Sequence, residues 1–146
     1  MAAIRQATVI WEGSLASGKG EVSADTSKAF SRLPVTWASR TEAANGLTSP
    51  EELIAAAHAS CYSMALSAGL SQAHTRPDRL EVTATVTFDR IEGNWRIVSS
   101  ALKVRGQVSG MDSSAFQKAA EAAKVGCPVS QALKGNVAIS VEANLL

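Results

Sequence analysis

The sequence contains few cysteines and few charges, and these shortages narrow the kind of protein it encodes. Only two of its 146 residues are cysteine, and nothing else in it indicates a secreted, disulfide-stapled protein. Charged residues make up 18% and hydrophobic residues 46%, a balance that argues against disorder and permits a sizeable core. The length suits one compact domain, so we expect a single domain over residues 1–146.

The sequence shows neither a basic stripe nor an opening segment typical of a signal peptide. The net charge is +1 and no run of Lys or Arg is dense, so we expect neither nucleic acid nor a membrane as a partner. Residues 1–10 contain no apolar run long enough for a signal peptide, which predicts a cytoplasmic location. Residues 53–70 carry no formal charge, but their polar side chains and many alanines favour a helix buried within a protein over a membrane helix.

Alternation and turn residues predict a mixture of strands and helices. We expect strands at residues 7–11, 21–23, 33–39, 80–89, 95–108 and 137–141. We expect helices at about residues 50–70, from a cap at 112 or 113 as far as Gly126, and briefly after Pro128. Hairpins and alternation indicate antiparallel pairing, so the predicted fold class is α+β.

The start of the long helix is marked by four successive residues. Ser49 is suited to the N-cap and Pro50 to the first helical position, while Glu51 and Glu52 place acidic charge in the first turn. Glu52 also stands three residues after Ser49, the spacing of a capping box. A helix that begins here carries Cys61 well beyond its first turn.

Cys61 lies in uncharged, alanine-rich surroundings, which raise the pKa of a thiol. A thiol attacks only as a thiolate, and the helix dipole gives little help so far from the helix start. A reactive Cys61 therefore needs a cation from elsewhere. Arg40, in the loop before the helix, is the candidate, with Glu51 holding its guanidinium through a bidentate pair. Arg32 and Arg5 are alternatives in the N-terminal part.

The spacing of Glu51 and Cys61 bears on the oligomeric state. Ten helical residues rise about 15 Å, so Glu51 cannot touch Cys61 on its own helix. An antiparallel copy of the helix, crossing near the alanines at 55–57, would bring Glu51 of one chain towards Cys61 of the other. We therefore expect a two-fold homodimer with shared active sites.

Cys127 stands directly before Pro128, at or near a helix N-cap, where free N–H groups stabilise a thiolate. This position suits a second cysteine that attacks the oxidised form of the first, because a sulfenic acid on Cys61 condenses with a neighbouring thiol. An external dithiol then resets the disulfide. Two alternatives stay open: cysteines that only pack in a core, and a purely structural disulfide.

His58 lies one turn before Cys61 and permits a Cys–His pair, but we favour a core histidine bonded to backbone or water. His58 and His74 with the two cysteines lack zinc-ligand spacing, so no metal is expected. No other cofactor is expected, because sulfur itself carries the redox change. Packing positions are expected for Trp11, Trp37 and Trp95.

Two segments of the chain form a distinctive combination. They are residues 49–66, SPEELIAAAHASCYSMAL, and residues 123–130, AKVGCPVS. Together they resemble the family of osmotically inducible and organic hydroperoxide resistance proteins, the OsmC/Ohr family, and the likeness extends over nearly the whole chain. The opening WEG and GKG, at 11–13 and 18–20, resemble the osmotically inducible branch more than the other.

The resemblance implies a thiol-dependent peroxidase that reduces organic hydroperoxides to alcohols. It implies Cys61 as the peroxidatic residue and Cys127 as the resolving one, joined in a Cys61–Cys127 disulfide, with Arg40 and Glu51 activating the thiol. It also implies an intertwined homodimer with strongly bent antiparallel sheets around central helices, and a thiol or lipoyl-type dithiol as reductant. The branch that has its active-site arginine in the first turn differs here, because this chain has Lys19 at that position.

Two functions without turnover remain as rivals. One is a binding or sensing module whose cysteine oxidation signals to a partner, and the other is a stress-induced structural dimer. Hydroperoxide and excess dithiol distinguish them: an enzyme consumes peroxide repeatedly, a sensor consumes one equivalent per thiol, and an inert dimer consumes none.

Overall fold

The computed structural model describes residues 1–146, which form two compact units, Met1–Leu53 and Ile54–Leu146. Both strands and helices are present, with two small sheets, so the α+β class is confirmed. A single domain over the whole chain stays a prediction.

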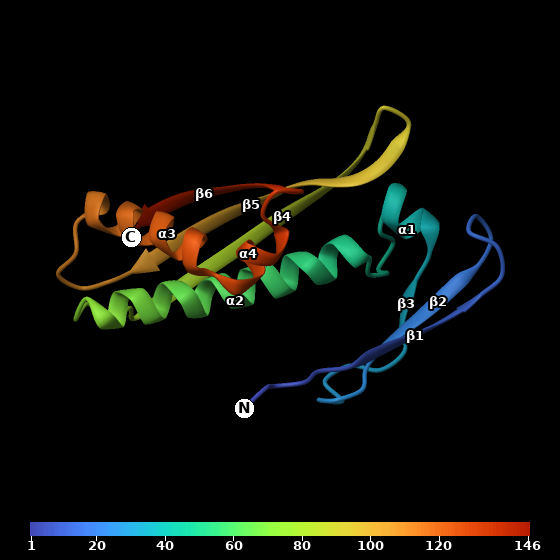
Figure 1. Cartoon of the computed structure of the whole chain (residues 1–146), viewed down its shortest axis with the longest axis horizontal. Helices are drawn as coiled ribbons and strands as arrows, with labels where there is room; N and C mark the ends of the chain where they lie inside the picture. Colours follow the sequence, from blue (N-terminus) through green and yellow to red (C-terminus); the bar gives the residue numbers. More distant parts are fainter. The chain divides into compact units, whose positions relative to one another are not determined.

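The first unit is built on a three-stranded antiparallel sheet, drawn in blue to cyan in Figure 1. Its strands, in the spatial order β1-β2-β3, are β1 (Ala7–Glu12), β2 (Lys19–Ala24) and β3 (Leu33–Val35). Val9 pairs with Val22, and Trp11 pairs with Gly20. Val22 is buried, whereas every residue of β1 is exposed. This sheet therefore has little core of its own.

The segment after β3 is a helix, where the sequence predicted a strand as far as Ser39. The strand ends at Val35, and α1 (Trp37–Thr41) follows. Thr36 at the N-cap accepts a hydrogen bond from the Ser39 N–H, and the Ser39 hydroxyl accepts one from the Thr36 N–H. This reciprocal capping box outweighs the strand-like composition. As a result Arg40, predicted in a loop, lies in the last turn of α1.

The long helix α2 (Pro50–Gln72) begins where the sequence predicts. The Ser49 hydroxyl accepts a hydrogen bond from the Glu52 N–H at 3.1 Å, as an N-cap does. The Glu52 carboxylate accepts instead from the Thr48 hydroxyl at 2.6 Å. By length and composition alone α2 passes as a membrane span, with 22% of its apolar window buried, but the core helix of a soluble protein passes the same test.

The second unit combines α2 with a second three-stranded sheet of order β4-β5-β6. Its other elements are β4 (Arg79–Ile91), β5 (Asn94–Gln107), α3 (Ser113–Gly126), α4 (Pro128–Leu133) and β6 (Ala138–Leu145). β4 and β5 form the predicted antiparallel hairpin, which turns at Glu92 and Gly93, both with positive φ. β6 pairs in parallel with β5, where antiparallel pairing was predicted, because α3 and α4 return the chain across the sheet before β6 begins.

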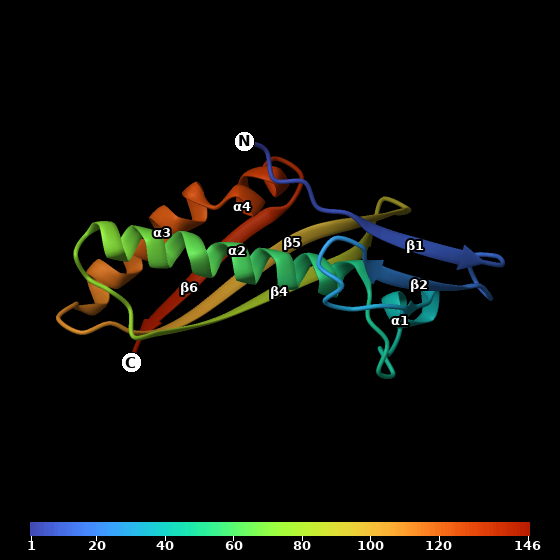
Figure 2. The ribbon, with the colours of Figure 1, turned by 90° about the horizontal axis from the view of Figure 1, so that it is seen from below.

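The helices of this unit cover one face of its sheet. Figure 2 shows α2 over β4 and β5, with α3 and α4 over β6. Exposed and half-buried residues alternate along β4, as the sequence predicts for a strand with one wet face. The core draws on α2, β5 and α3 and includes Tyr62, Leu66, Leu70, Leu102, Val104 and Phe116.

A glycine brings α3 close to the sheet. The ring of Phe116, which is fully buried, lies directly over Gly106 of β5. A Cβ at Gly106 would lie 2.7 Å from Phe116 Cε2 and closer still to Cζ, so no other residue fits there without moving the ring. This contact fixes how closely α3 approaches β5.

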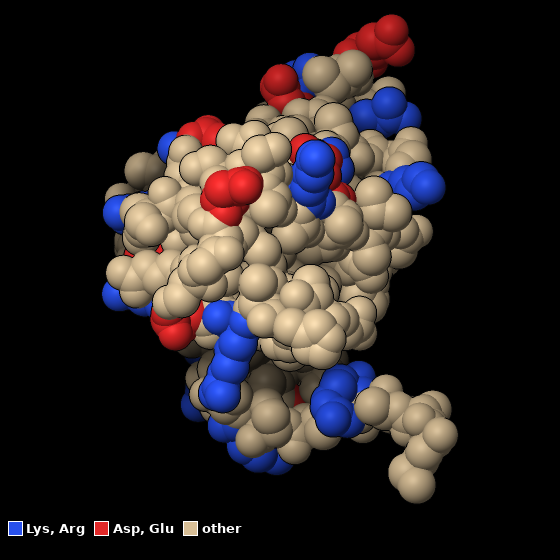
Figure 3. All heavy atoms as spheres, turned by 90° about the vertical axis from the view of Figure 1, so that its left-hand side faces the viewer, with Lys and Arg blue, Asp and Glu red and all other residues tan.

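Charges of both signs are spread over the surface. On the face shown in Figure 3, basic and acidic side chains are scattered among uncharged atoms. Some pair with each other, as Arg32 does with Glu21 at 2.9 Å and Arg79 with Glu81 at 3.0 Å. Such exposed pairs contribute little to stability.

Candidate active site

Cys61 lies in the middle of α2, partly buried against the core of the second unit. Burial raises the pKa of its thiol, as the sequence predicts. The backbone N–H of Val129 opposes this shift, and the neighbouring Cys127 adds to it. No lysine or arginine contributes to the shift. The surroundings of Cys61 in its own unit therefore favour the neutral thiol.

Cys127 links α3 to α4 and is fully buried, at the predicted N-cap of α4. Burial alone raises the pKa of such a thiol. The N–H and hydroxyl of Ser130, the Cys61 thiol and the N–H of Val129 outweigh burial and lower the pKa of Cys127. The sulfur makes no short capping hydrogen bond, so these donors act on it at longer range. The net effect has the predicted sign, and Cys127 ionises more readily than Cys61 within this unit.

The two thiols are neighbours, and both are free. Cys127 raises the pKa of Cys61, and Cys61 in turn lowers the pKa of Cys127. Helix α2 and the junction between α3 and α4 thus place the two thiols near each other. Disulfide formation requires such proximity.

Arg40 and Glu51 form an ion pair within the first unit. The guanidinium approaches one carboxylate oxygen, Glu51 Oε1, with Nε at 2.9 Å and Nη2 at 2.8 Å. The predicted pairing is confirmed, with two guanidinium nitrogens on the single oxygen Oε1. The second oxygen, Glu51 Oε2, is buried and has no hydrogen-bond partner. A buried carboxylate oxygen without a donor is costly.

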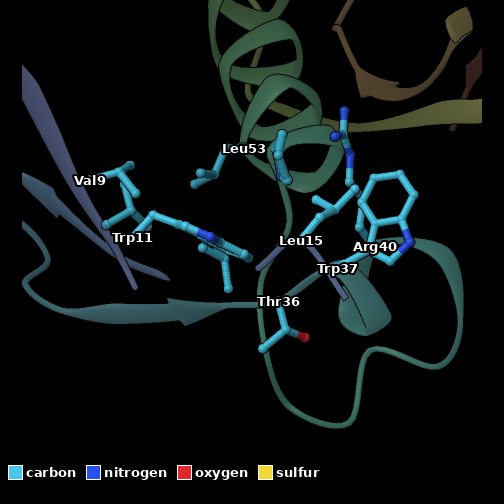
Figure 4. A pocket seen from close by; sticks show the side chains of 10 residues that line it. Val9, Trp11, Leu15, Thr36, Trp37, Arg40 and Leu53 are labelled. Carbon is cyan, nitrogen blue, oxygen red and sulfur yellow. The ribbon is translucent and has the colours of Figure 1, made fainter. Parts of the chain in front are cut away.

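Arg40 also borders an apolar cavity of about 320 Å³ in the first unit. Figure 4 shows its lining, in which Arg40 and Trp37 come from α1, Trp11 from β1 and Leu53 from the start of α2. The Arg40 guanidinium carbon lies 5.7 Å from the centre of the Trp37 ring, within the range of a cation–π contact. The sequence placed both tryptophans in packing positions, and no local signal revealed the cavity.

A second hollow, of about 780 Å³, lies beside Cys61 in the second unit. Small side chains of α2 and α3 line it, among them Ala65, Ala119 and Ala122, with Lys118 as its charged member. Because Cys61 is one of the residues that line the hollow, a small molecule that enters it can approach this residue between the two helices.

His58 is fully buried one turn before Cys61 and does not pair with it. Its Nδ1 lies 2.6 Å from the hydroxyl oxygen of Ser100, and its Nε2 lies 2.8 Å from that of Ser130. Burial lowers the pKa of His58, which keeps the ring neutral at neutral pH. The predicted core histidine is confirmed, but its partners are two serine side chains and not backbone or water.

The four predicted site residues thus form two pairs, one in each unit. Arg40 and Glu51 are joined in Met1–Leu53, and Cys61 and Cys127 are joined in Ile54–Leu146. The approach of Arg40 to Cys61 and the homodimer stay predictions. No group of three or more His, Cys, Asp or Glu side chains is placed to hold a metal ion.

Comparison with known proteins decides the family. The sequence model of the OsmC-like protein family matches residues 43–142. The chain belongs to the OsmC-like family. It is 42% identical over 132 residues to the peroxiredoxin OsmC of Escherichia coli, covering 90% of this chain and 91% of that protein. It is 32% identical over 95 residues to an organic hydroperoxide resistance protein of Xanthomonas axonopodis pv. citri, covering 64% and 65% of the two chains.

A solved structure agrees with this assignment. The organic hydroperoxide resistance protein OhrB of Bacillus subtilis superposes with a TM-score of 0.72 at 25% identity, covering 95% of this chain and 98% of that one. The family and fold predictions are therefore confirmed. The names of the curated relatives also confirm the prediction of an enzyme of the thiol-dependent peroxidase class, and they support a redox function directed at peroxides.

Proposed function

We propose that this protein reduces organic hydroperoxides to alcohols through a Cys61 sulfenic acid and a Cys61–Cys127 disulfide. The observation that carries the proposal is the proximity of two free thiols, one on α2 beside a hollow and one at the N-cap of α4. Membership of the OsmC-like family supports the same chemistry. In this proposal the enzyme is a cytoplasmic homodimer without a nucleic-acid or membrane partner.

The proposed reaction begins at the Cys61 sulfur. Its thiolate attacks the distal oxygen of ROOH, the O–O bond breaks, and the departing RO⁻ takes a proton and leaves as ROH. The sulfur is oxidised by two electrons to a sulfenic acid, while the peroxide is reduced. The Cys127 thiol then attacks this sulfur, the S–O bond breaks, and the hydroxyl leaves with the Cys127 proton as water. A thiol or lipoyl-type dithiol reduces the disulfide and becomes oxidised itself.

Arg40 has the charge that this first step needs. Cys61 gains no stabilisation of its thiolate from a cation of its own unit, so the proposal assigns that task to the Arg40 guanidinium. The same charge stabilises the negative charge that develops on the peroxide oxygens. Glu51 supports this role because it holds two guanidinium nitrogens and so fixes their direction. The apolar cavity beside Arg40 suits the hydrocarbon part of an organic hydroperoxide.

Two observations support a second copy of the chain in the active site. Helix α2 buries little of its apolar length within one chain. Glu51 Oε2 is buried without a donor. An antiparallel copy of α2 would cover the exposed apolar length of this helix. It would also bring the Glu51 carboxylate of one chain towards Cys61 of the other. We therefore include the shared site of a two-fold dimer in the proposal.

The test measures consumption of cumene hydroperoxide in the presence of excess dithiol. The unmodified protein should consume many equivalents, and Cys61→Ser should abolish consumption because the attacking sulfur is lost. Cys127→Ser should allow at most a first oxidation or a slower cycle with added thiol. Ser60→Ala, which alters the exposed neighbour of Cys61, is the matched control and should retain consumption.

The alternatives give other results. Consumption that stops after one equivalent per thiol would identify a redox sensor, and none at all would identify a structural dimer. Full turnover by Cys61→Ser would show that another group is the nucleophile.

A further inference from the structure

A row of buried polar groups runs from the sheet to the second cysteine. It starts at Ser100 on β5, passes through both ring nitrogens of His58 on α2, and continues to the Ser130 hydroxyl on α4. Ser130 is the third residue of α4, which places its hydroxyl near the sulfur of the N-cap residue Cys127, and this hydroxyl lowers the pKa of that thiol. His58 and Ser100 have no exposed surface and Ser130 is 3% exposed, so water does not compete for these contacts.

The direction of the hydrogens along this row follows from counting donors. A serine hydroxyl has one hydrogen, and a neutral imidazole carries one N–H. If the Ser130 hydrogen points at the Cys127 sulfur, the Ser130 oxygen must receive the Nε2–H of His58. Nδ1 then carries no hydrogen and accepts a hydrogen bond from the Ser100 hydroxyl. Every group in the row is satisfied in this arrangement, as buried polar groups normally are.

The opposite tautomer gives a different result. With the hydrogen on Nδ1, the ring donates to Ser100, and Nε2 must receive the hydrogen of Ser130. The Cys127 sulfur then loses its hydroxyl donor. The state of His58 therefore decides whether Ser130 donates to the sulfur.

We propose that His58 is a positioning residue for Cys127. By donating from Nε2 to Ser130, it directs the Ser130 hydroxyl at the Cys127 sulfur and so speeds the attack of Cys127 on the Cys61 sulfenic acid. This inference rests on the proposed function. In that step an S–S bond forms, the S–O bond of the sulfenic acid breaks, and water leaves with the Cys127 proton. Ser130 and His58 stabilise the attacking thiolate and are unchanged at the end.

The size of the effect follows from two opposing terms. Loss of one hydrogen bond to a charged sulfur lowers the thiolate population by about tenfold or more. A less stabilised thiolate is more nucleophilic, which recovers roughly half of this loss on a logarithmic scale. Removing the Ser130 hydroxyl should therefore slow disulfide formation by roughly three- to tenfold.

The experiment separates the two steps in a single turnover. Reduced protein is mixed with one equivalent of cumene hydroperoxide, samples are quenched with dimedone at intervals, and intact mass gives the sulfenic acid and the disulfide. In Ser130→Ala the sulfenic acid should form at the normal rate and decay roughly three- to tenfold more slowly. Ser130→Thr, which keeps the hydroxyl, should restore the decay. Ser63→Ala, which removes a hydroxyl bonded to the α2 backbone, is the control.

A second variant tests whether His58 acts through Ser130. His58→Gln should slow the decay in the same direction, and combining it with Ser130→Ala should add nothing, because both changes remove the same donor. If either variant fails to fold, Ser100→Ala frees Nδ1 at the far end of the row and should slow the same step to a smaller degree.

Several results would overturn this inference. One is an unchanged rate of sulfenic acid decay in the single variants. Another is an equal slowing of sulfenic acid formation and decay, and a third is additive slowing in the double variant. Failure of the unmodified protein to form a sulfenic acid or disulfide would instead disprove the proposed function, so the two failures are distinguishable.

Discussion

The two units differ in the packing that surrounds their candidate site residues. In Ile54–Leu146 the thiols lie against a core of fully buried side chains such as Tyr62, Leu66 and Phe116. In Met1–Leu53 the Arg40–Glu51 pair stands beside a thin sheet in which Val22 is the buried apolar residue. The sulfur chemistry is thus supported by a rigid interior, whereas the cation belongs to a part of the chain with few internal restraints.

The sharpest way to test this difference is to remove a side chain from each unit. Leu66→Ala empties a fully buried position and should lower the free energy of unfolding by about 2–5 kcal/mol. Ile10→Ala changes a residue of β1 that is 63% exposed and should cost no more than about 0.5 kcal/mol. Urea unfolding measures both. If Ile10→Ala is equally costly, β1 is covered by something outside its unit, and a cost that falls on dilution would identify a second copy.

A second prediction concerns the two arginine–glutamate pairs of the first unit. Arg40→Met removes a half-buried cation and leaves the buried Glu51 carboxylate without a partner. It should lower kcat/KM for an organic hydroperoxide by about 10²-fold, because the charge at the reacting oxygens is lost. Arg32→Met removes a well-exposed cation that holds both oxygens of Glu21 and is the matched control.

The control should leave kcat/KM and stability nearly unchanged, since exposed pairs contribute little. A large loss of activity in Arg32→Met with normal activity in Arg40→Met would reverse the assignment and make Arg32 the activating residue.

The smallest predicted effect is a pH dependence that belongs to the second unit. Burial lowers the pKa of His58 in the folded protein, whereas the unfolded chain titrates near 6.5. The unfolded state therefore binds more protons below pH 6.5, and stability present above that value is lost as the pH falls towards the folded pKa. Urea unfolding between pH 7.5 and 5.5 should show this decline. His58→Asn should show a shallower one, because carboxylate contributions are common to both proteins; an unchanged slope would contradict the prediction.

Local sequence signals predicted the parts of the site that depend on neighbours in the chain. Ser49, Pro50 and Glu51 marked the start of α2 correctly, and the order Gly126-Cys127-Pro128 placed the second cysteine at an N-cap. These predictions succeed because capping is decided within one turn of helix.

The sequence did not reveal helix α1 or the interactions between residues that are distant in the chain. The strand-like composition of residues 33–39 concealed α1, because the reciprocal hydrogen bonds of Thr36 and Ser39 outweigh propensity. The parallel pairing of β6 depends on where α3 and α4 return the chain. Ser100 and Ser130 meet His58 only in the folded protein, although Ser130, three residues after Cys127, is at a position from which it can donate back to a capping side chain.

The lack of a side chain at Gly106 affects more than its own strand. Because Gly106 has no side chain, the Phe116 ring packs directly on β5, and this contact sets the distance between α3 and the sheet. The final residue of α3 is bonded to Cys127, so that distance also sets the depth of the second sulfur. A glycine on β5 thereby influences how close Cys127, at the other end of α3, lies to Cys61.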